Sequence, residues 1–464
     1  MPSTHGTLPY LPTLRSRLVS AGYIRSWLSD SLTNYAKHRI LDVLRKGVLK
    51  GSLRIEDKDN TYDFGTSTDK EPTVIMKVRS PDVWMRILTS ADIGIAEAYM
   101  FQDIDVSSLT GLFGVWLDNR DTLLGLESGL SGIFAQYSAL AMTWLGRYNP
   151  YMSKRHVEFA YDISNSFFQA FLSEDMMYSC PVWSDEENGI NGDLKFGPTP
   201  GDLEAAQQRK IQSIIRKARL RPGDRLLEIG SGWGAMAVAA AKLGCTVDTI
   251  TLSKEQLTLV EERARAAGVA DRIRVHLCDY RDLPKDFEHS FDALISTEMI
   301  EAVGKRYLPT YFQVIDWALK TDRATMVLTS TSQPEHRHSE YQSDDFCRRY
   351  HWPNVYLPSA TSLAVSVQDA CPGKFVFTDL EDHTFHYPRA LREWGRRLEK
   401  NFTPELAKEL QDRFPLFRDP KELEAFRRKW LYMFAYAEVG FARGYTTLPC
   451  WTFTRPENVP EVCA

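Results

Sequence analysis

A short apolar strand that runs directly into a series of glycines constrains this chain most. In Arg225-Leu-Leu-Glu-Ile-Gly-Ser-Gly-Trp-Gly234, the apolar residues precede glycines at alternate positions, Gly230, Gly232 and Gly234. Glycine has no Cβ, so the backbone of such a strand-to-helix turn can come close to a ligand. Open α/β sheets bind ligands in the crevice outside the carboxyl ends of their strands. The stretch therefore predicts a ligand-binding turn of an α/β sheet.

The acidic residue in this strand narrows the class of ligand. Glu228 stands near the carboxyl end of the strand, where its carboxylate does not favour a phosphate but can accept hydrogen bonds from a cationic amine. S-adenosylmethionine (SAM) carries an ammonium and a sulfonium, whereas a nucleotide pyrophosphate is anionic. The sequence thus favours SAM, with an ordinary tight turn as the alternative interpretation of this stretch alone.

Strand-like and helix-like segments alternate through the middle of the chain. Strands are expected at 225–229, 246–251, 273–277, 291–296 and 325–331, and helices at 235–243, 254–267 and 307–318. This alternation predicts a doubly wound, Rossmann-like α/β fold with a parallel sheet. If the glycine turn of this sheet binds SAM, we expect the fold to be of the class I SAM-methyltransferase type. Inserted helices follow Thr331, and late strands at 375–380 and 451–454 are expected to close the sheet.

Polar and aromatic residues follow the second and third of these strands. Thr251 ends the second strand, and Gln256 can hydrogen-bond the diol of a ribose. Asp279 can accept from an adenine amine, while Tyr280 offers a stacking face. Each is common in loops, but together at successive strand ends they predict a SAM site.

Composition limits the class of protein. A length of 464 residues predicts two or three domains at about 150 residues each. The net charge of −5 argues against nucleic-acid binding, and seven cysteines without a C-x-x-C pair indicate a reducing compartment with no zinc site. No signal pattern is present, and the longest apolar run, 133–145, is too short to span a bilayer. We expect a cytoplasmic protein without a bound metal.

The first 145 residues differ from the rest in their pattern of charged and apolar residues. Six basic residues and one acid lie between Lys37 and Arg54, interleaved with apolar residues at roughly helical spacing. Such a helix can lie on an anionic membrane surface, although a solvated face over a core face explains the pattern equally well. With strand-like pieces at 53–55 and 73–78, the segment predicts a smaller α+β domain on the lipid and membrane side, at 1–145. The catalytic domain is expected at 146–464, after the turn-rich Gly146–Lys154.

Several longer motifs carry a family resemblance. They are Tyr161-Asp-Ile-Ser-Asn165, Met177-Tyr-Ser-Cys180, Leu227–Gly234, Asp279-Tyr-Arg-Asp-Leu283, Glu298-Met-Ile-Glu-Ala-Val-Gly304 and Leu391-Arg-Glu-Trp394. With them the chain resembles the cyclopropane-fatty-acyl-phospholipid synthase family, which includes mycolic acid cyclopropane synthases and fungal and plant relatives. The resemblance covers about 157–456 and is weaker over 53–109.

The resemblance implies methyl transfer to an alkene, followed by loss of a proton from the carbocation and ring closure. Many family members are thought to hold bicarbonate as the base, and Cys180, Glu301 and Tyr387 match three of its ligands. Cys180 would act through its backbone or side chain, not as a nucleophile. The resemblance also places Tyr178, Ser179 and Thr297 at the cofactor. The alternative interpretations of the three bicarbonate ligands are a buried packing cysteine for Cys180, a carboxylate at a helix start for Glu301 and a core tyrosine for Tyr387.

The chain departs from the family pattern on the other side of this base site. Thr331 stands where the family carries a histidine, and Gln333 replaces an isoleucine two residues later. Tyr350-His-Trp-Pro-Asn-Val355 replaces Tyr-Ile-Phe-Pro-Gly-Gly. Bicarbonate binding and ring closure are therefore open, and His336, His338 or His351 could act as the base or lie on the surface.

The leading hypothesis is a SAM-dependent C-methyltransferase that acts on the double bond of an unsaturated acyl chain of a phospholipid and forms a cyclopropane. It would work as a peripheral enzyme on an anionic membrane, with a homodimer as the usual family assembly. The alternatives are a methyl-branched or methylenated lipid product, a soluble secondary metabolite as substrate, and a relative that binds SAM or lipid without turnover. Sphingolipid C-methyltransferases are a related possibility, but they usually carry N-terminal membrane spans, which we do not find here.

Overall fold

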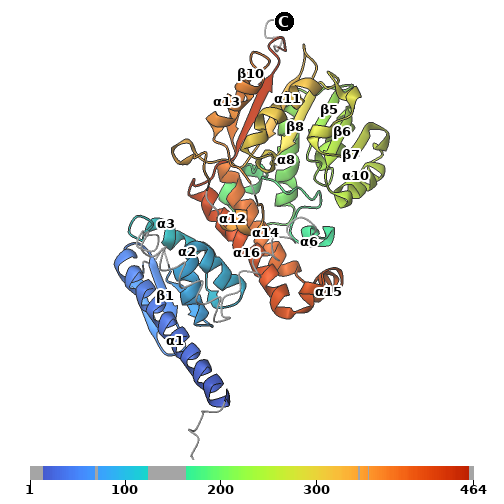
Figure 1. Cartoon of the computed structure of the whole chain (residues 1–464). Coiled ribbons are helices and arrows are strands. Elements are labelled where there is room, and N and C mark those ends of the chain that lie inside the picture. The colour runs from blue at the N-terminus through green and yellow to red at the C-terminus, as the bar shows by residue number, and fades with distance from the viewer. Residues whose placement is uncertain (1–13, 68–71, 124–162, 343–344, 354, 459–464) are drawn as a thin grey trace, which may run out of the picture. The chain divides into compact units, whose positions relative to one another are not determined.

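Two compact units make up the chain. The computed structural model describes residues 14–67, 72–123, 163–342, 345–353 and 355–458 (Figure 1). The units are Met1–His156 and Val157–Ala464, and each contains a sheet of its own. The turn-rich segment 146–154, the apolar run 133–145 and the start of the 161–165 motif lie outside the described residues. The role of the first unit on the lipid side remains a prediction.

The first unit is built on a four-stranded mixed sheet with the order β2-β1-β3-β4. β1 pairs antiparallel with β2 and parallel with β3, and β3 pairs antiparallel with β4. The elements are α1 (Leu14–Gly47), β1 (Ser52–Glu56), β2 (Thr61–Gly65), β3 (Val74–Val78), α2 (Asp82–Met100), β4 (Ile104–Val106) and α3 (Leu109–Asp118). The predicted α+β character is confirmed.

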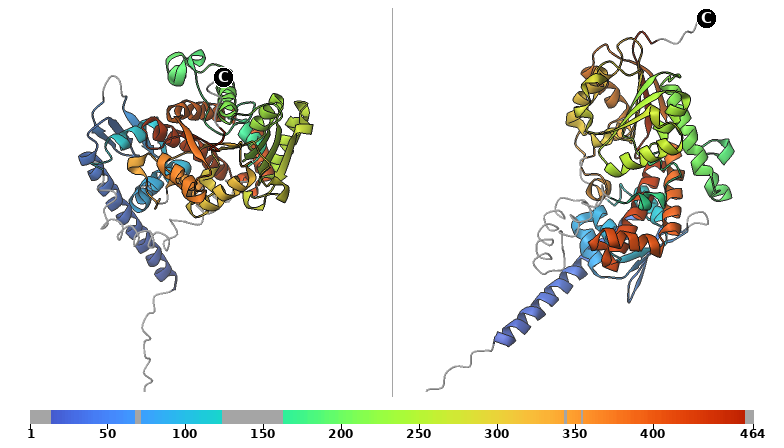
Figure 2. Two further views of the ribbon diagram at one scale, coloured as in Figure 1. Left: turned by 90° about the horizontal axis from the view of Figure 1, so that it is seen from above. Right: turned by 90° about the vertical axis from the view of Figure 1, so that its right-hand side faces the viewer.

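The long helix α1 supplies the core of this unit (Figure 2). Ile40, Leu41 and Leu44 are buried there against the strands and α2. The prediction of one helix over Lys37–Arg54 is wrong at its end, because α1 stops at Gly47 and Arg54 lies on β1. The chain turns into β1 through Gly51, whose φ of 73° is a conformation that glycine adopts freely. The apolar face of this segment therefore belongs to a protein core.

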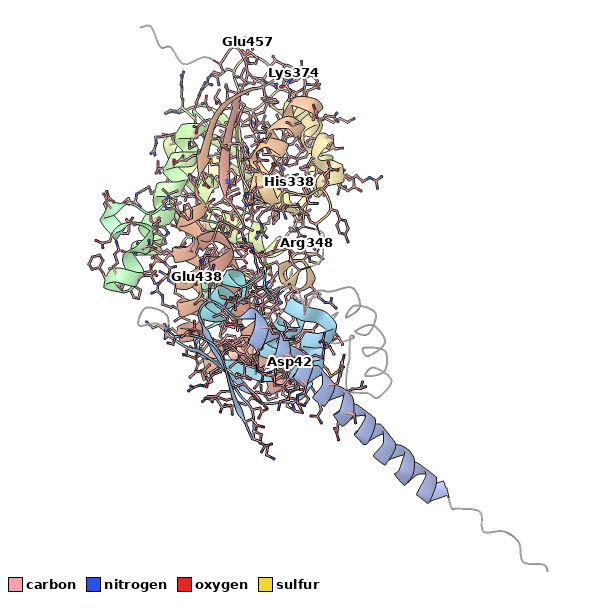
Figure 3. All side chains as sticks on the ribbon, turned by 90° about the vertical axis from the view of Figure 1, so that its left-hand side faces the viewer. Asp42, His338, Arg348, Lys374, Glu438 and Glu457 are labelled. Atoms are coloured by element: carbon pink, nitrogen blue, oxygen red, sulfur yellow. The ribbon has the colours of Figure 1, made fainter. Side chains whose placement is uncertain are left out.

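The charges at this end of α1 are only partly paired. Lys37 pairs with Asp57, and Arg45 donates to Asp42 at 2.8 Å (Asp42 is labelled in Figure 3). Lys46 and Lys50 are exposed. Among the described residues, no helix is both long enough and apolar enough to cross a bilayer.

The second unit is built on a seven-stranded sheet with the order β10-β11-β9-β8-β5-β6-β7. The five strands from β9 to β7 in this order are parallel to one another, and β11 runs antiparallel between β9 and β10. The strands are β5 (Arg225–Ile229), β6 (Thr246–Thr251), β7 (Ile273–Leu277), β8 (Ala293–Thr297), β9 (Thr325–Thr329), β10 (Val376–Asp382) and β11 (Pro449–Thr454). The predicted doubly wound α/β class is confirmed.

Helices cover both faces of this sheet because successive strand residues point to opposite sides. Leu226 packs on the side of α8 and α9, and Leu227 packs on the side of α11. Since Glu228 follows two residues after Leu226, its side chain lies on the α8 side. The covering helices are α8 (Asp202–Lys217), α9 (Ala235–Leu243), α10 (Lys254–Ala266), α11 (Leu308–Ala318) and α13 (Ala360–Ala370).

A further group of helices lies next to the carboxyl ends of the parallel strands (Figure 1). α14 and α16 pack along each other, and Tyr387 at the start of α14 bonds to Glu298 just after β8. The group consists of α6 (Asn165–Gln169), α12 (Phe346–Tyr350), α14 (Tyr387–Asn401), α15 (Pro404–Arg413) and α16 (Pro420–Ala442). Of these, α12, α14, α15 and α16 are inserted helices of the kind that the loose pattern after Thr331 predicted, whereas α6 precedes the sheet in the chain.

Candidate active site

The glycine turn after β5 leaves open space beside one of its glycines. Gly230, Gly232 and Gly234 have φ values of 96°, 48° and 88°. A Cβ on Gly230 would lie 3.2 Å from the Met299 side chain, and one on Gly234 would lie 3.0 Å from Val260. A Cβ on Gly232 would meet nothing within 4 Å. Gly230 and Gly234 therefore allow close packing, while the backbone at Gly232 borders space that a ligand can fill.

Glu228 is a buried carboxylate beside this turn. Thr249 on β6 donates a hydrogen bond to Glu228 Oε2 at 2.6 Å. Burial raises the pKa of Glu228 to about 8, although the Thr249 hydroxyl opposes the shift. A cationic ligand would favour the ionised carboxylate. The site therefore fits the ammonium of SAM, as the sequence predicts.

Thr251 and Gln256 are joined at the end of β6. The Thr251 hydroxyl donates to Gln256 Oε1 at 2.7 Å and accepts from the Ser253 backbone N–H at 3.1 Å. This bond uses the carbonyl of the Gln256 amide, so its NH₂ group can donate elsewhere. The arrangement suits recognition of ribose hydroxyls.

The residues after β7 are more constrained than the sequence indicates. Arg281 holds Asp279 in a bidentate ion pair, with N···O distances of 2.7 and 2.8 Å. Arg281 also lowers the pKa of Asp279. The Tyr280 ring meets Tyr311 edge-on at 5.1 Å. An adenine amine would share Asp279 with Arg281, because each carboxylate oxygen can accept more than one hydrogen bond.

Two glutamates follow β8, which ends at Thr297, and of these Glu298 is half-buried and Glu301 is buried. Glu298 has a φ of 48°, and Glu301 lies in the short helix η7 (Ile300–Ala302). The backbone N–H of Thr331 donates to Glu301 Oε1 at 2.5 Å. Glu301 Oε2 is buried and has no hydrogen-bond partner among the described residues. Burial and the nearby charge of Glu298 raise the pKa of Glu301 to about 8, so this oxygen is a potential proton acceptor.

Two donors converge on Glu298. The backbone N–H of Cys180 donates to Oε1 at 2.7 Å, and the Tyr387 hydroxyl donates to Oε2 at 2.6 Å. Burial raises the pKa of the Cys180 thiol well above its ordinary value, which keeps the thiol protonated. Cys180 thus contacts Glu298 through its backbone, while its thiol donates to the Pro181 carbonyl at 3.3 Å.

The predicted bicarbonate ligands do not fit a bound anion in this arrangement. Two of the three, Cys180 and Tyr387, already satisfy Glu298, whose own negative charge would repel bicarbonate. Thr331, which replaces the family histidine, contributes its backbone N–H to Glu301 rather than its side chain. The donors thus serve carboxylates of the chain itself.

The three histidines considered as replacement bases lie elsewhere. His336 is exposed, and His338, labelled in Figure 3, pairs with the Tyr356 hydroxyl at 3.1 Å. His351 is buried, which lowers its pKa well below the ordinary value. Within the described residues, no hydrogen bond connects any of them to Glu298 or Glu301.

The sequence reasoning missed two residues of α8. Lys210 Nζ donates to Ser179 Oγ at 2.6 Å, and Gln207 Nε2 donates to the Ser179 carbonyl at 2.8 Å. Burial lowers the pKa of Lys210 to about 8, while the charges of Glu298 and Glu228 raise it. Lys210 is thus a buried cation near both carboxylates. The sequence does show Gln207 and Lys210 three positions apart on the apolar face of a helix, and this pattern could have indicated a buried polar site.

Aromatic rings surround the Tyr178 side of the site. The Tyr178 ring lies 5.4 Å from Trp394 and 5.6 Å from Phe168, which in turn lies 4.9 Å from Trp233 in the glycine turn. The Tyr178 hydroxyl is buried without a hydrogen-bond partner among the described residues. Further rings belong to Phe167, Phe171, Trp430 and Phe434. Such a shell excludes water and presents π faces to a developing cation.

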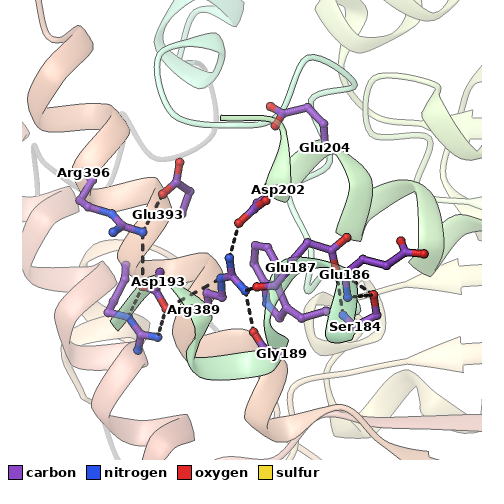
Figure 4. Close-up of polar contacts among 12 residues, drawn as sticks. Ser184, Glu186, Glu187, Gly189, Asp193, Asp202, Glu204, Arg389, Glu393 and Arg396 are labelled. Carbon is purple, nitrogen blue, oxygen red and sulfur yellow. Dashed lines mark hydrogen bonds and ion pairs between the residues drawn. The ribbon is translucent and has the colours of Figure 1, made fainter. Parts of the chain in front are cut away.

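An ion-pair network fixes α14 against the segment after Cys180 (Figure 4). Arg389 donates to the carbonyls of Glu187 and Gly189, each at 2.6 Å. Arg392 pairs with the buried Asp193 through two hydrogen bonds of 2.8 Å. Because α14 begins at Tyr387, this network helps to hold the Tyr387 hydroxyl near Cys180.

Comparisons with known proteins agree with this geometry. The mycolic acid cyclopropane synthetase family matches residues 149–448. The tuberculostearic acid methyltransferase of Mycobacterium tuberculosis is 30% identical over 417 residues, covering 89% of this chain and 90% of the relative. The cyclopropane-fatty-acyl-phospholipid synthase of Escherichia coli is 31% identical over 345 residues, covering 73% and 80%. The structure of a cyclopropane synthase from M. tuberculosis shares the fold, with a TM-score of 0.51 and 22% identity over 65% of this chain and 98% of that one.

Proposed function

Because the chain belongs to the mycolic acid cyclopropane synthetase family of SAM-dependent methyltransferases, we propose that it methylates the double bond of an unsaturated acyl chain of a phospholipid and closes a cyclopropane ring. The observation that carries the proposal is the pair formed by the half-buried Glu298 and the buried Glu301, at the strand ends next to an aromatic shell. An alkene needs no activating base, but the carbocation formed from it must lose a proton in a place that water does not reach.

The glycine turn and the residues after β5, β6 and β7 would hold SAM. Glu228 would accept from its ammonium, Gln256 would bind the ribose, and Asp279 with Tyr280 would bind the adenine. When bound, SAM supplies an electrophilic methyl group to the alkene carbon. Tyr178, Ser179 and Thr297 would border the cofactor from the side of the substrate.

The chain's own residues would then act on the substrate cation. The rings around Tyr178 exclude water and stabilise positive charge through their π faces. Glu301 takes up a proton through Oε2, which has no other partner among the described residues. Glu301 accepts the proton in its ionised form, and its raised pKa of about 8 makes that carboxylate a stronger base than an ordinary glutamate.

A methyl-branched lipid is the second candidate product. One relative of this chain is a methyltransferase, and another is a cyclopropane synthase. Both products arise from the same carbocation and differ in the carbon that loses the proton. The position of Glu301 relative to the new methyl group would decide between them.

The proposal is tested by incubating the purified protein with SAM and phospholipid vesicles and analysing the lipids by mass spectrometry. A monounsaturated phospholipid is expected to gain one CH₂ unit, whereas a matched saturated phospholipid stays unchanged. Equal labelling of both lipids, or of neither while SAM still binds, would contradict an alkene lipid as the substrate.

A further inference from the structure

The carboxylate of Glu298 is bound by two hydrogen-bond donors from other parts of the chain, which together could bind an anion. Its Oε1 accepts from the Cys180 backbone N–H at 2.7 Å, and its Oε2 accepts from the Tyr387 hydroxyl at 2.6 Å. One donor comes from a loop before α8 and the other from the start of α14. The side chain is half-buried and both of its oxygens accept a hydrogen bond, so these two donors are committed to one carboxylate.

The backbone at this position is unusual for a glutamate. Glu298 has a φ of 48°, in the left-handed region that favours glycine. Its backbone N–H is anchored by a hydrogen bond of 2.9 Å to the Thr329 carbonyl. Strained residues persist where the surrounding structure fixes them, and they cluster at functional sites. The left-handed backbone and the two donors together place a carboxylate where a glycine would leave the donors open.

We infer that Glu298 is a built-in replacement for a bound anion, so that this protein does not take up bicarbonate and passes the substrate proton directly to Glu301. This inference rests on the proposed function. The C–H bond of the new methyl group breaks, its electron pair forms the ring C–C bond, and the proton goes to Glu301 Oε2. Glu298 itself is a positioning residue that keeps a second anion out and fixes Tyr387 and Cys180.

The local charges support this assignment. Glu228 and Glu301 are buried and Glu298 is half-buried, and Lys210 is a buried cation that acts on Glu228 and Glu298. A further anion beside Glu298 would add like charge to a site that already holds three carboxyl groups. The donors that would stabilise that anion are already occupied.

The test compares wild type with Glu298→Gly, which frees both donors and suits the left-handed backbone. ¹³C-bicarbonate is titrated into each protein, saturated with S-adenosylhomocysteine, and binding is followed by ¹³C NMR and calorimetry. We expect no saturable binding to wild type and at least tenfold tighter binding to Glu298→Gly. Glu298→Gln, which keeps the side-chain volume, is the matched control and should not bind. These measurements need no turnover, so they remain decisive even if the lipid substrate is wrong.

Turnover provides the second readout. Wild-type activity should be the same in bicarbonate-depleted and bicarbonate-supplemented buffer, while that of Glu298→Gly should rise at least tenfold with bicarbonate. Saturable binding of bicarbonate to wild type would overturn the inference, and so would stimulation of wild type by bicarbonate. Absence of binding to Glu298→Gly, in a variant that still binds S-adenosylhomocysteine, would overturn the claim that the two donors form an anion site.

Discussion

Replacing Glu301 by glutamine separates its role as a proton acceptor from its effect on stability. The amide keeps the Oε1 atom that accepts from the Thr331 backbone N–H, but it cannot take up a proton. Loss of a positioned general base typically lowers the rate by about 10²- to 10⁴-fold. Since Glu301 is outside the glycine turn, SAM affinity should change by less than about threefold, or about 0.6 kcal/mol.

The same change should make the protein more stable at neutral and alkaline pH. Burial raises the pKa of Glu301 from 4.5 to about 8, so the folded state binds a proton that the unfolded state has lost. Stability therefore falls as pH rises from 4.5 through 8 in wild type but not in the variant. At pH 7 the difference is at most about 3.4 kcal/mol, from about 2.5 pH units at about 1.36 kcal/mol each. An unpaired amide donor would offset about 1–2 kcal/mol of it.

Denaturant unfolding of both proteins between pH 5 and 9 measures this difference, alongside turnover and calorimetric SAM binding. The variant should gain stability relative to wild type as pH rises, while it loses activity. Near-wild-type turnover would remove Glu301 from the chemistry. A stability difference independent of pH would show that Glu301 is ionised in the folded protein.

The remaining predictions concern cofactor charge, membrane contact and the α14 network. SAM binding at pH 7 should release protons, because a cation favours the ionised form of Glu228, whose pKa is about 8 in the free protein. Calorimetry in buffers of different ionisation enthalpy measures this proton release. The variant Glu228→Gln should abolish it. Replacing Lys46 and Lys50 by glutamine should weaken binding to anionic liposomes about thirtyfold, at about 1 kcal/mol for each of the two charges near the surface. Lys242→Gln on α9 should have no such effect, and unchanged partitioning of the double variant would contradict membrane docking through Lys46 and Lys50. Asp193→Asn should lower the free energy of unfolding by about 3–5 kcal/mol, because it removes the buried carboxylate that Arg392 and Arg396 share. A loss below about 1 kcal/mol in chemical denaturation would show that the network is not needed.

The sheet and the cofactor side of the site could be predicted from the sequence because the patterns that indicate them are local. Alternating strand and helix patterns predicted the doubly wound fold, and the three glycines predicted a turn that a ligand can approach, for which the structure leaves space beside Gly232. The error at the end of α1 has a simple cause. Basic residues continue from the helix into β1, so charge spacing alone does not mark the turn at Gly51.

The proton-accepting side was harder to predict because it depends on contacts between distant segments. The motif containing Glu298 and Glu301 was visible, but nothing in it indicates that Cys180 and Tyr387 both donate to Glu298. Lys210 likewise looks like one more charged residue of an amphipathic helix. Its burial against Ser179 follows only from the way α8 packs on the sheet.

The most direct test of the account is the isotope content of the lipid formed from SAM whose methyl group carries three deuterium atoms. We predict a product that keeps two of the three and has lost its double bond, because the new methyl group gives one of its own hydrogens to Glu301 as the ring closes. A product that keeps all three deuterium atoms would contradict ring closure and indicate a methyl-branched lipid.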